Sequence, residues 1–342
     1  MRAAVMRGTK LAVEDVPDPA PGQGEILVKT LACGICGSDL HTLQHGDRMV
    51  ELSVESGAPF VMDLDRPVVM GHEFCAEVLE LGENAGTGVA PGDRIVSIPV
   101  VIGQGGMQSV GYSNDYPGGY GELMALSSML AIKVPNGLSS ELAALTEPMA
   151  VGRHAVSRSG ITPGKAAVVI GCGPVGLAVI ADLKLRGIEP IVAADHSPAR
   201  RALAATMGAT EVVDPAVEPV ADAWKRVDGT KSLVMFEAVG VPGLIDSAMA
   251  AAPRGARVVV VGVCMEPDSI RPMLGIAKEL DVSFALGYSY EEFAGTLRSI
   301  AEGELDVAPL ITGRVGVDGV PQAFADLANP DAHCKILVTP NP

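Results

Sequence analysis

The chain of 342 residues is 48% hydrophobic and only 19% charged, which predicts a folded protein of two domains, each with its own core. A formal net charge of −16 excludes the basic surface that binds nucleic acid, and no apolar segment is long enough to span a membrane. The six scattered cysteines, and a first segment without a signal-peptide core, favour reduced thiols and a cytoplasmic location.

The first part of the chain is predicted to be mainly β. Short segments of alternating polarity, separated by Pro and Gly clusters, predict strands at 3–6, 11–13, 25–31, 73–81 and 94–98. Ser139 is expected to cap a helix that runs toward Glu147, and a second helix is expected over 150–158. Two stretches, 46–66 and the Gly- and Ser-rich 103–121, are predicted to be loops.

From Lys165 onward, apolar strands alternate with helices, which is typical of a parallel sheet covered on both faces. The expected strands are 166–170, 190–194, 211–213, 233–236 and 257–262, with helices at 198–207 and 242–251. After residue 286 the chain is expected to return to the first domain through a helix near 290–302 and a strand at 335–338. The predicted fold class is therefore α/β, with a doubly wound domain at 153–286 inserted into a mainly β domain of 1–152 and 287–342.

The sequence GCGPVG directly follows the first of these strands and opens a helix. Gly171 allows the tight turn, Gly173 lets the backbone approach a pyrophosphate, and Gly176 lets the helix pack on the strand. Pro174 and Val175 complete the turn, and the helix N-terminus offers free N–H groups to phosphates. The order of strand, loop and helix predicts a dinucleotide site; the alternative is a glycine turn without a nucleotide.

Asp195 ends the next strand, about twenty residues after the last of these glycines, where a dinucleotide site places an acid. Its carboxylate can accept both hydroxyls of the adenosine ribose and would repel a 2′-phosphate, so NAD is favoured over NADP. Arg200 and Arg201 follow, and a basic pair can in principle hold a phosphate, which keeps NADP open.

Candidate metal ligands occur in three separate segments. The segment CGSDLH begins with Cys36 and ends with His41. His72 and Glu73 are adjacent in a second segment, and Glu147 lies where the two domains meet. A thiolate, an imidazole and a carboxylate from separate loops suit a catalytic zinc with one open position. Spacing alone does not decide this, because one buried Cys and two loop His residues would give the same pattern.

Several motifs together carry a family resemblance: GICGSDLH at 34–41, GHE at 71–73, PGDRI at 91–95, GGYGE at 118–122, EPMAVGRHA at 147–155 and GCGPVG at 171–176. Over nearly the whole chain they resemble the zinc-dependent medium-chain alcohol dehydrogenases, and within these the sorbitol- and threonine-dehydrogenase-like branch. The resemblance implies a GroES-like catalytic domain, a Rossmann domain, one catalytic zinc ion per subunit and NAD. It also implies a homodimer or homotetramer, joined through the cofactor domain's edge strand, placed at about 257–262.

The resemblance assigns roles to individual residues. Cys36 and His72 would bind zinc, with Glu147 as the resident third ligand or a water-bridged neighbour and Glu73 as its exchange partner. The same resemblance gives Arg200 a ribose contact. It places further residues along the nicotinamide and pyrophosphate, namely Val239, Val261, Val263, Leu286 and Lys335. For Lys335 a merely solvated position is the alternative.

The implied reaction oxidises an alcohol or polyol, with a secondary alcohol favoured, to a ketone or aldehyde. Zinc would lower the pKa of the substrate hydroxyl, and the carbon bearing it would pass a hydride to NAD. Ser38 would take the hydroxyl proton and His41 would carry it through the ribose to solvent, unless His41 is structural. The competing interpretations are a zinc-free quinone or enoyl reductase of the same superfamily and a non-catalytic nucleotide-binding sensor.

Two departures from the family pattern stand out. Many relatives bind a second, structural zinc through four closely spaced cysteines, whereas residues 97–121 contain no cysteine. That lobe is therefore expected to be missing. The stretch 48–66 is longer than usual and includes Met49, Phe60 and Met62. It is interpreted either as a lid over the substrate cleft or as a solvated surface loop.

Overall fold

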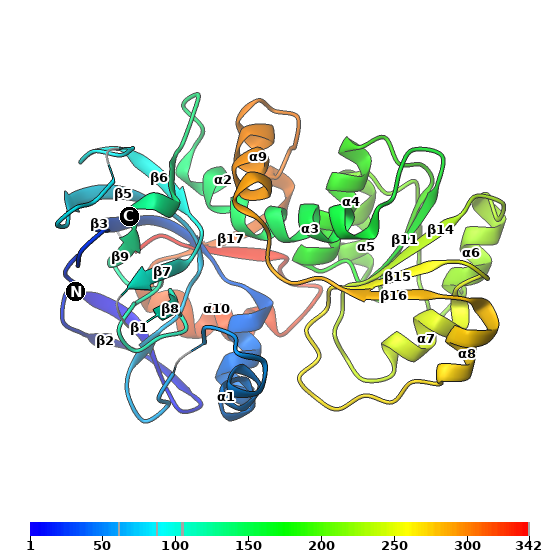
Figure 1. Ribbon diagram of the computed structural model, residues 1–342, viewed down its shortest axis with the longest axis horizontal. Coiled ribbons are helices and arrows are strands. Elements are labelled where there is room, and N and C mark those ends of the chain that lie inside the picture. Colours follow the sequence, from blue (N-terminus) through cyan, green and yellow to red (C-terminus); the bar gives the residue numbers. More distant parts are fainter. Residues whose placement is uncertain (61, 87, 104–105, 341–342) are drawn as a thin grey trace.

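The computed structural model describes residues 1–60, 62–86, 88–103 and 106–340. It consists of two lobes side by side, with helices α1 (Gly37–Ser56) and α9 (Tyr290–Ala301) between them (Figure 1). One lobe is mainly β and holds both the first and the last strands of the chain, and the other is a layered α/β unit.

In the described residues, the mainly β lobe contains three antiparallel or mixed sheets. The smallest pairs two strands as a hairpin, β7 (Val100–Gly103) and β8 (Gly106–Ser109). A second sheet has the order β2 (Lys10–Asp15), β1 (Arg2–Arg7), β4 (Val68–Val69). The largest has the order β10 (Ala131–Lys133), β6 (Arg94–Ser97), β5 (Glu73–Leu81), β3 (Glu25–Gly34), β18 (Lys335–Val338), β17 (Ile311–Val315), with β9 (Leu123–Ser127) also on β3.

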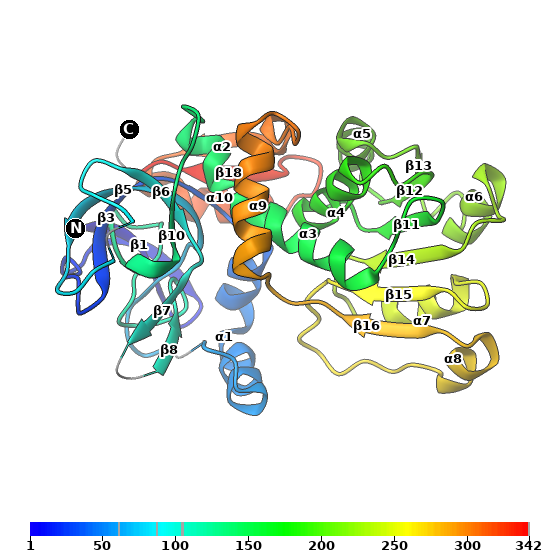
Figure 2. The same cartoon turned by 45° about the horizontal axis from the view of Figure 1, so that its top comes forward.

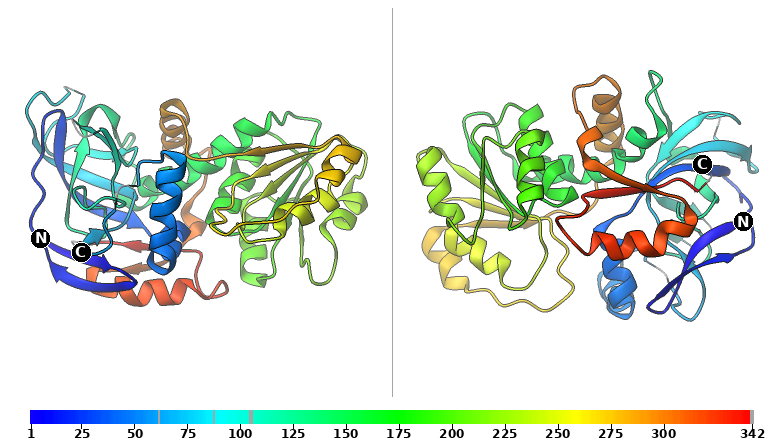
Figure 3. Two further views of the ribbon diagram at one scale, coloured as in Figure 1. Left: turned by 60° about the horizontal axis from the view of Figure 1, so that its bottom comes forward. Right: turned by 180° about the vertical axis from the view of Figure 1, so that it is seen from behind.

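Segments from the end of the chain complete this lobe (Figure 3). Strand β18 pairs antiparallel with β3, with Leu337 opposite Gly34. Helix α9 (Tyr290–Ala301) buries Phe293 and Leu297 in a cluster with Cys75 of β5. The remaining elements here are helices α2 (Ser140–Ala144) and α10 (Val320–Leu327), and the 3₁₀ turns η1 (Ser128–Leu130), η2 (Ala308–Leu310) and η3 (Val317–Gly319).

The second lobe is built on a parallel sheet of six strands, which confirms the predicted doubly wound fold. Its order is β13 (Glu211–Val213), β12 (Ile191–Ala194), β11 (Ala166–Ile170), β14 (Leu233–Glu237), β15 (Arg257–Val260), β16 (Asp281–Phe284). The first strand of the unit is central and the order reverses beside it. That reversal creates the crevice in which Rossmann sheets bind dinucleotides.

Helices cover both faces of this sheet (Figure 2). Alternate residues of β11 separate the two layers: Ala167 and Val169 join one core cluster, and Ala166 and Val168 join another. The helices on the first face include α3 (Thr146–Ser159), α4 (Pro174–Leu185) and α5 (Pro198–Met207), whose buried residues fill the first cluster. The second cluster takes in α6 (Val220–Val227) and α7 (Leu244–Ala251), and α8 (Pro272–Lys278) packs against α7.

The expected edge strand at 257–262 is wrong. Strand β15 is an interior strand, paired on both sides, and the edges are β13 and β16. The sequence prediction omitted β16 because its four residues, DVSF, form no apolar run and are largely exposed. An edge strand pairs with a neighbour on one side only, so its residues can be polar and exposed.

The predicted loop at 46–66 is also wrong for its first half, because helix α1 extends over Gly37–Ser56. Its buried positions recur every three or four residues, but four of the five are polar or small: Asp39, Thr42, Gly46, Met49 and Ser53. A helix is predicted from apolar residues that recur every three or four positions, and these buried residues are mostly not apolar. A break in helical geometry at His45 interrupts the pattern further. Met49 and Met62 are buried in the core of the β lobe, so the stretch 48–66 packs against it; residue 61 lies outside the described residues.

Other boundaries shift by smaller amounts. Ser139 caps α2 as predicted, accepting a hydrogen bond from the Leu142 N–H, and the second helix begins earlier, at Thr146. The predicted loop at 103–121 begins with the β7–β8 hairpin, and residues 104–105 lie outside the described part. Among the described helices, none combines the length and the apolar character needed to cross a lipid bilayer.

Candidate metal and dinucleotide site

Three of the predicted metal ligands lie together. Cys36 immediately precedes α1, and His72 and Glu73 lie where the chain enters β5. One ligand atom from each falls within 4.8 Å of the others, and the imidazole and carboxylate are buried. A thiolate, an imidazole and a carboxylate converging from two segments fit Zn²⁺ by donor chemistry, with room in the coordination shell for another oxygen.

Glu147 lies beside this group but outside it. It is in the first turn of α3, is buried, and accepts a hydrogen bond of 3.0 Å from the Tyr288 hydroxyl. Burial raises the pKa of Glu147 to about 7, and the nearby Glu73 adds to the rise while His72 opposes it. The second carboxylate oxygen of Glu147 has no described hydrogen bond, and so remains able to bind a cation.

Lys335 occupies a position that sequence reasoning did not foresee. Its ammonium is buried and donates to both Glu73 oxygens, at 2.7 and 2.6 Å, and to the carbonyl of Ile35 at 3.0 Å. With its donors directed there, Lys335 does not lie in solvent but forms an ion pair beside the metal ligands. A contact with the pyrophosphate stays a prediction.

A buried carboxylate, Asp39, organises the groups around His72. It accepts hydrogen bonds from the hydroxyls of Tyr112 at 2.8 Å and Tyr120 at 2.6 Å, and from the N–H of Cys36 at 3.1 Å. The nearest His72 nitrogen, Nδ1, is 3.4 Å from Asp39. Burial opposes the charged form of both partners, yet this pairing lowers the pKa of Asp39 and raises that of His72.

Sequence reasoning did not select Asp39, Tyr112, Tyr120 or Tyr288 as site residues. The available signal for Asp39 was its place inside CGSDLH, between candidate site residues; the helix that buries its carboxylate was not predicted. The three tyrosines come from distant loops, and only the fold brings their hydroxyls to the site.

Ser38 and His41 both lie in the first turns of α1. The Ser38 hydroxyl is 2.9 Å from that of Tyr112. His41 is half-buried, and burial lowers its pKa, with a further lowering from the neighbouring His45. Figure 3 (left) shows α1, in blue, between the two lobes.

The glycine-rich turn has the geometry of a phosphate-binding loop. Gly171 has φ +92°, and a Cβ on Gly176 would lie 1.9 Å from the Gly171 carbonyl oxygen, so neither position accepts a side chain. Around Gly173 there is open space, with Arg200 as the nearest group at 4.0 Å. Gly173 is also the N-cap of α4 and Pro174 its first residue, so helix N–H groups point toward that space.

The other predicted cofactor residues follow the carboxyl ends of neighbouring strands. Asp195 follows β12 and accepts hydrogen bonds of 2.8 Å from the N–H groups of Cys172 and Ser197. Three apolar side chains after β14, β15 and β16 are exposed there: Val239, Val263 and Leu286. Val261 is instead buried, in the core of this lobe.

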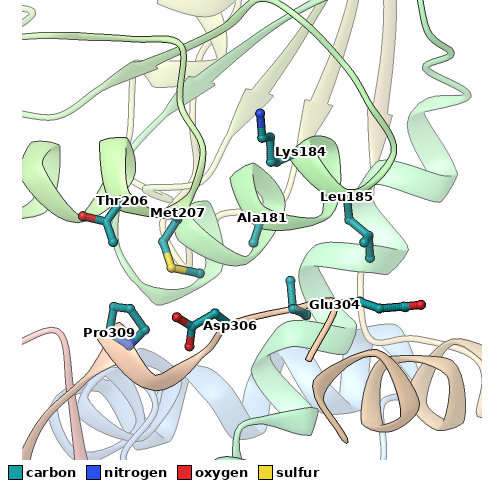
Figure 4. A pocket seen from close by; sticks show the side chains of 9 residues that line it. Ala181, Lys184, Leu185, Thr206, Met207, Glu304, Asp306 and Pro309 are labelled. Carbon is teal, nitrogen blue, oxygen red and sulfur yellow. The ribbon is translucent and has the colours of Figure 1, made fainter. Parts of the chain in front are cut away.

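A separate cavity of about 360 Å³ contains none of these residues (Figure 4). It is lined by the C-terminal ends of α4 and α5 and by the segment 304–309, including Lys184, Glu304 and Asp306. Since the dinucleotide turn is at the opposite end of α4, this cavity is not part of the candidate site.

Comparison with known proteins identifies the family. The zinc-binding dehydrogenase family model matches residues 174–302, and the alcohol dehydrogenase GroES-like domain model matches residues 22–136. An (R,R)-butanediol dehydrogenase of Bacillus subtilis (strain 168) is 33% identical over 353 residues, covering 100% of both chains. The chain belongs to the zinc-binding medium-chain dehydrogenase family. It is an enzyme of the NAD-dependent alcohol and polyol dehydrogenase type, in a butanediol- and sorbitol-dehydrogenase-like branch.

Other relatives support the same branch and fold. A sorbitol dehydrogenase of B. subtilis (strain 168) is 29% identical, covering 100% of this chain and 98% of its own. The crystal structure of 2R,3R-butanediol dehydrogenase from B. subtilis is 32% identical and superposes with a TM-score of 0.85, covering 99% of both chains. A Sinorhizobium meliloti 1021 protein described as a zinc-binding dehydrogenase, solved with NADP, is 28% identical, with a TM-score of 0.85 and 99% coverage of both chains.

Proposed function

We propose that this enzyme transfers a hydride between a secondary alcohol, with a vicinal diol or polyol as the favoured substrate, and NAD. The observation that carries the proposal is that one short segment, 286–288, connects the cofactor edge of the sheet with the candidate metal ligands. Leu286 follows the sheet's β16 at the cofactor edge, and Tyr288, two residues later, bonds to Glu147 beside Cys36, His72 and Glu73.

Cys36 and His72 would hold the zinc ion, and a carboxylate would complete the protein ligands. Both oxygens of Glu73 already accept from Lys335, whereas Glu147 has one oxygen without a described hydrogen bond. This difference favours Glu147 as the resident ligand and Glu73 as its exchange partner. Bound zinc would supply a Lewis acid that makes an alcohol hydroxyl easier to deprotonate.

The chain's own groups would manage the proton. Ser38 follows Cys36 by two residues, so its hydroxyl can accept a hydrogen bond from an alcohol placed next to the metal ligands. His41, one helical turn further along α1 and half-buried, would pass the proton to solvent by way of the cofactor ribose. Its pKa, lowered by burial, keeps the ring neutral and able to accept a proton at neutral pH.

The nucleotide is proposed to be NAD. Asp195 is fixed by two backbone N–H groups, which leaves its remaining lone pairs for ribose hydroxyls. Arg201 is committed to the carbonyls of Asp195 and His196 and to Asp214, so a 2′-phosphate would find only Arg200. Asp195→Gly should move the preference toward NADP, measured as the ratio of kcat/KM for the two nucleotides; an unchanged ratio would refute the assignment.

The deciding experiment follows nucleotide reduction with a panel of secondary alcohols, including butane-2,3-diol stereoisomers and sorbitol, alongside zinc analysis. We expect stoichiometric zinc and turnover with at least one diol or polyol, and loss of both in Cys36→Ser. A zinc-free protein that reduces quinones or enones would establish the reductase alternative instead. Tight nucleotide binding without turnover of any of these compounds would establish a binding protein.

We also propose a homodimer or homotetramer joined through β16. Its outer edge pairs with no strand in the described part of the chain, and Phe284 is 63% exposed there. The unpaired backbone groups of an edge strand are a template for pairing with a second copy of the same strand. The proposed location is the cytoplasm, since all six cysteines, each among the described residues, are free thiols. Light scattering would show the oligomer, and Phe284→Lys should shift it toward monomer.

A further inference from the structure

A contact between the two lobes lies beside the acid that is proposed to bind the adenosine ribose. The hydroxyl of Ser197, in the sheet lobe, donates a hydrogen bond to the carboxylate of Asp331. Asp331 belongs to the loop between α10 and β18 of the β lobe, and this loop, in red, extends to the sheet lobe in Figure 3 (right). Three residues further on, Cys334 is buried in the core cluster that also contains Cys172 of the glycine-rich turn. The loop therefore packs beside the part of the sheet lobe that would hold the nucleotide.

Ser197 lies between two carboxylates. Its backbone N–H donates to Asp195 Oδ1 at 2.8 Å, and its side chain donates to Asp331. Ser197 is only 4% exposed, so both contacts belong to the packed boundary between the lobes. The sheet lobe supplies one carboxylate and the β lobe supplies the other. Sequence reasoning found only Asp195, because Asp331 comes from a distant part of the chain.

Asp331 also lies at the N-terminus of α5. Ser197 is the N-cap of this helix of 10 residues, and its hydroxyl oxygen accepts a hydrogen bond of 3.2 Å from the Arg200 N–H. A helix N-terminus favours a nearby anion, because its free N–H groups carry partial positive charge. Here the anion is a carboxylate from the other lobe. A 2′-phosphate on the ribose beside Asp195 would have to approach this second negative charge.

Arg200 is the cation that such a phosphate could use. Its Nε is buried and has no hydrogen-bond partner among the described residues. Arginine binds phosphate readily through its several N–H groups, so an unopposed Arg200 would favour NADP. Asp195 precedes the first turn of α5, which carries Arg200, and Asp331 contacts the N-cap of the same turn. The two carboxylates thus oppose the attraction of Arg200 for an additional phosphate.

We propose that Asp331 is a specificity-determining residue that helps the enzyme to reject NADP. The inference rests on the proposed use of NAD and extends it. Asp195 would meet the ribose directly, and Asp331 would add a second repulsion of the 2′-phosphate from the opposite lobe. The β lobe would therefore take part in choosing the nucleotide, which the sequence assigned to the sheet lobe alone.

The test compares Asp331→Asn with the wild type. The Asn side chain keeps a carbonyl oxygen for the Ser197 hydroxyl and removes only the charge. Fluorescence titration of the intact enzyme gives the Kd for NADH and for NADPH. The ratio of the NADPH value to the NADH value should fall about three- to tenfold in Asp331→Asn.

Asp326→Asn is the matched control. Asp326 lies in α10 of the same lobe and accepts a hydrogen bond of 2.8 Å from Gln322 of the same helix. Its substitution removes the same charge without touching Ser197, so the ratio of the two Kd values should equal that of the wild type.

Ionic strength separates charge repulsion from a structural role. Salt screens an exposed charge, so the difference between Asp331→Asn and the wild type should shrink at high salt. In an Asp195→Gly background, Asp331→Asn should still lower the ratio, because its charge acts through space. An unchanged ratio, equal changes in both Kd values, an effect that is the same at high salt, or loss of the effect in the Asp195→Gly background would overturn the inference. A wild type that binds NADPH more tightly than NADH would refute the proposed NAD preference, and the inference with it.

Discussion

The Lys335–Glu73 ion pair is buried on both sides, with side chains 1% and 0% exposed. Removing one partner leaves the other charge buried without a counter-charge, which typically lowers the free energy of unfolding by about 3–5 kcal/mol. Replacing both partners with apolar groups often leaves stability unchanged. Lys335→Met should therefore lower the free energy of unfolding of the zinc-free protein by about that amount, and Lys335→Met/Glu73→Leu should recover most of it.

Urea unfolding of Lys335→Met, of Glu73→Leu and of the double variant measures this coupling. Lys133→Met is the matched control, because Lys133 forms a largely exposed pair with Asp93 and should leave stability almost unchanged. If Lys335→Met unfolded at the same urea concentration as wild type, the pair would have no structural role.

Glu147 gives a pH-dependent prediction. Its pKa is raised to about 7 from an ordinary value near 4.5, so the folded state holds the proton more tightly than the unfolded state does. Stability of the zinc-free protein should then decline as pH rises from about 4.5 to 7. Glu147→Gln should remove part of that decline, being equal to wild type near pH 4.5 and more stable at pH 8.

With zinc present the effect of Glu147→Gln should reverse, because an amide is a weaker zinc ligand than a carboxylate. Urea midpoints at pH 4.5 and 8, with and without zinc, distinguish the two effects. Parallel pH profiles for wild type and variant in the zinc-free state would contradict the burial argument.

At the scale of elements, the packing of α3 against α4 sets the position of Glu147 relative to the dinucleotide turn. Gly152 of α3 faces α4 so closely that a Cβ would lie 2.5 Å from the Ala178 backbone. Gly→Ala within a helix normally stabilises by about 1 kcal/mol, through propensity. Here Gly152→Ala should instead destabilise by about 1–3 kcal/mol, because α4 cannot move away without disturbing the core.

Gly275→Ala in α8 is the matched control. Its added Cβ would meet only the Met249 side-chain terminus at 3.4 Å, an ordinary contact. This variant should be neutral or slightly stabilised in thermal unfolding. Equal Tm changes in the two variants would show that helix propensity, not helix contact, decides the outcome.

At the scale of the whole molecule, a hydrogen bond from Arg48 connects the two lobes beside the cofactor edge. Arg48 of α1 donates to the carbonyl of Met265 at 3.2 Å, and Met265 is buried in the core of the β lobe although it follows β15 of the sheet lobe. This contact holds the segment that carries Val261 and Val263 against α1. Its loss should loosen the cofactor side of the boundary between lobes.

Arg48→Ala should weaken NADH binding up to about fivefold, the equivalent of one ordinary hydrogen bond of about 1 kcal/mol, with bound zinc unchanged. Fluorescence titration with NADH measures the Kd. Arg66→Ala, which removes an exposed pair with Asp115 within the β lobe, should leave Kd unchanged. Equal affinities for Arg48→Ala and wild type would show that the contact does not support the cofactor-binding geometry.

Sequence by itself determined the features that depend on local chemistry. The parallel strands of the sheet lobe are continuous apolar runs, and the turn from Gly171 to Gly176 is specified by backbone requirements that only glycine meets. The motifs that contain Cys36 and His72 allowed the family to be predicted, because each motif is contiguous in the sequence. None of this required knowledge of distant contacts.

Only the tertiary structure decided which groups meet across loops. Helix α1 was missed because polar and small residues face its interior, and β16 because an edge strand can be polar. The ion pair of Lys335 was not foreseen, and Tyr112 and Tyr288 were overlooked, since their hydrogen-bond partners are 262, 74 and 141 positions away in the chain, respectively. Local propensity carries no information about such pairs; they exist because folding excludes water from the site, and each buried polar group then needs a partner.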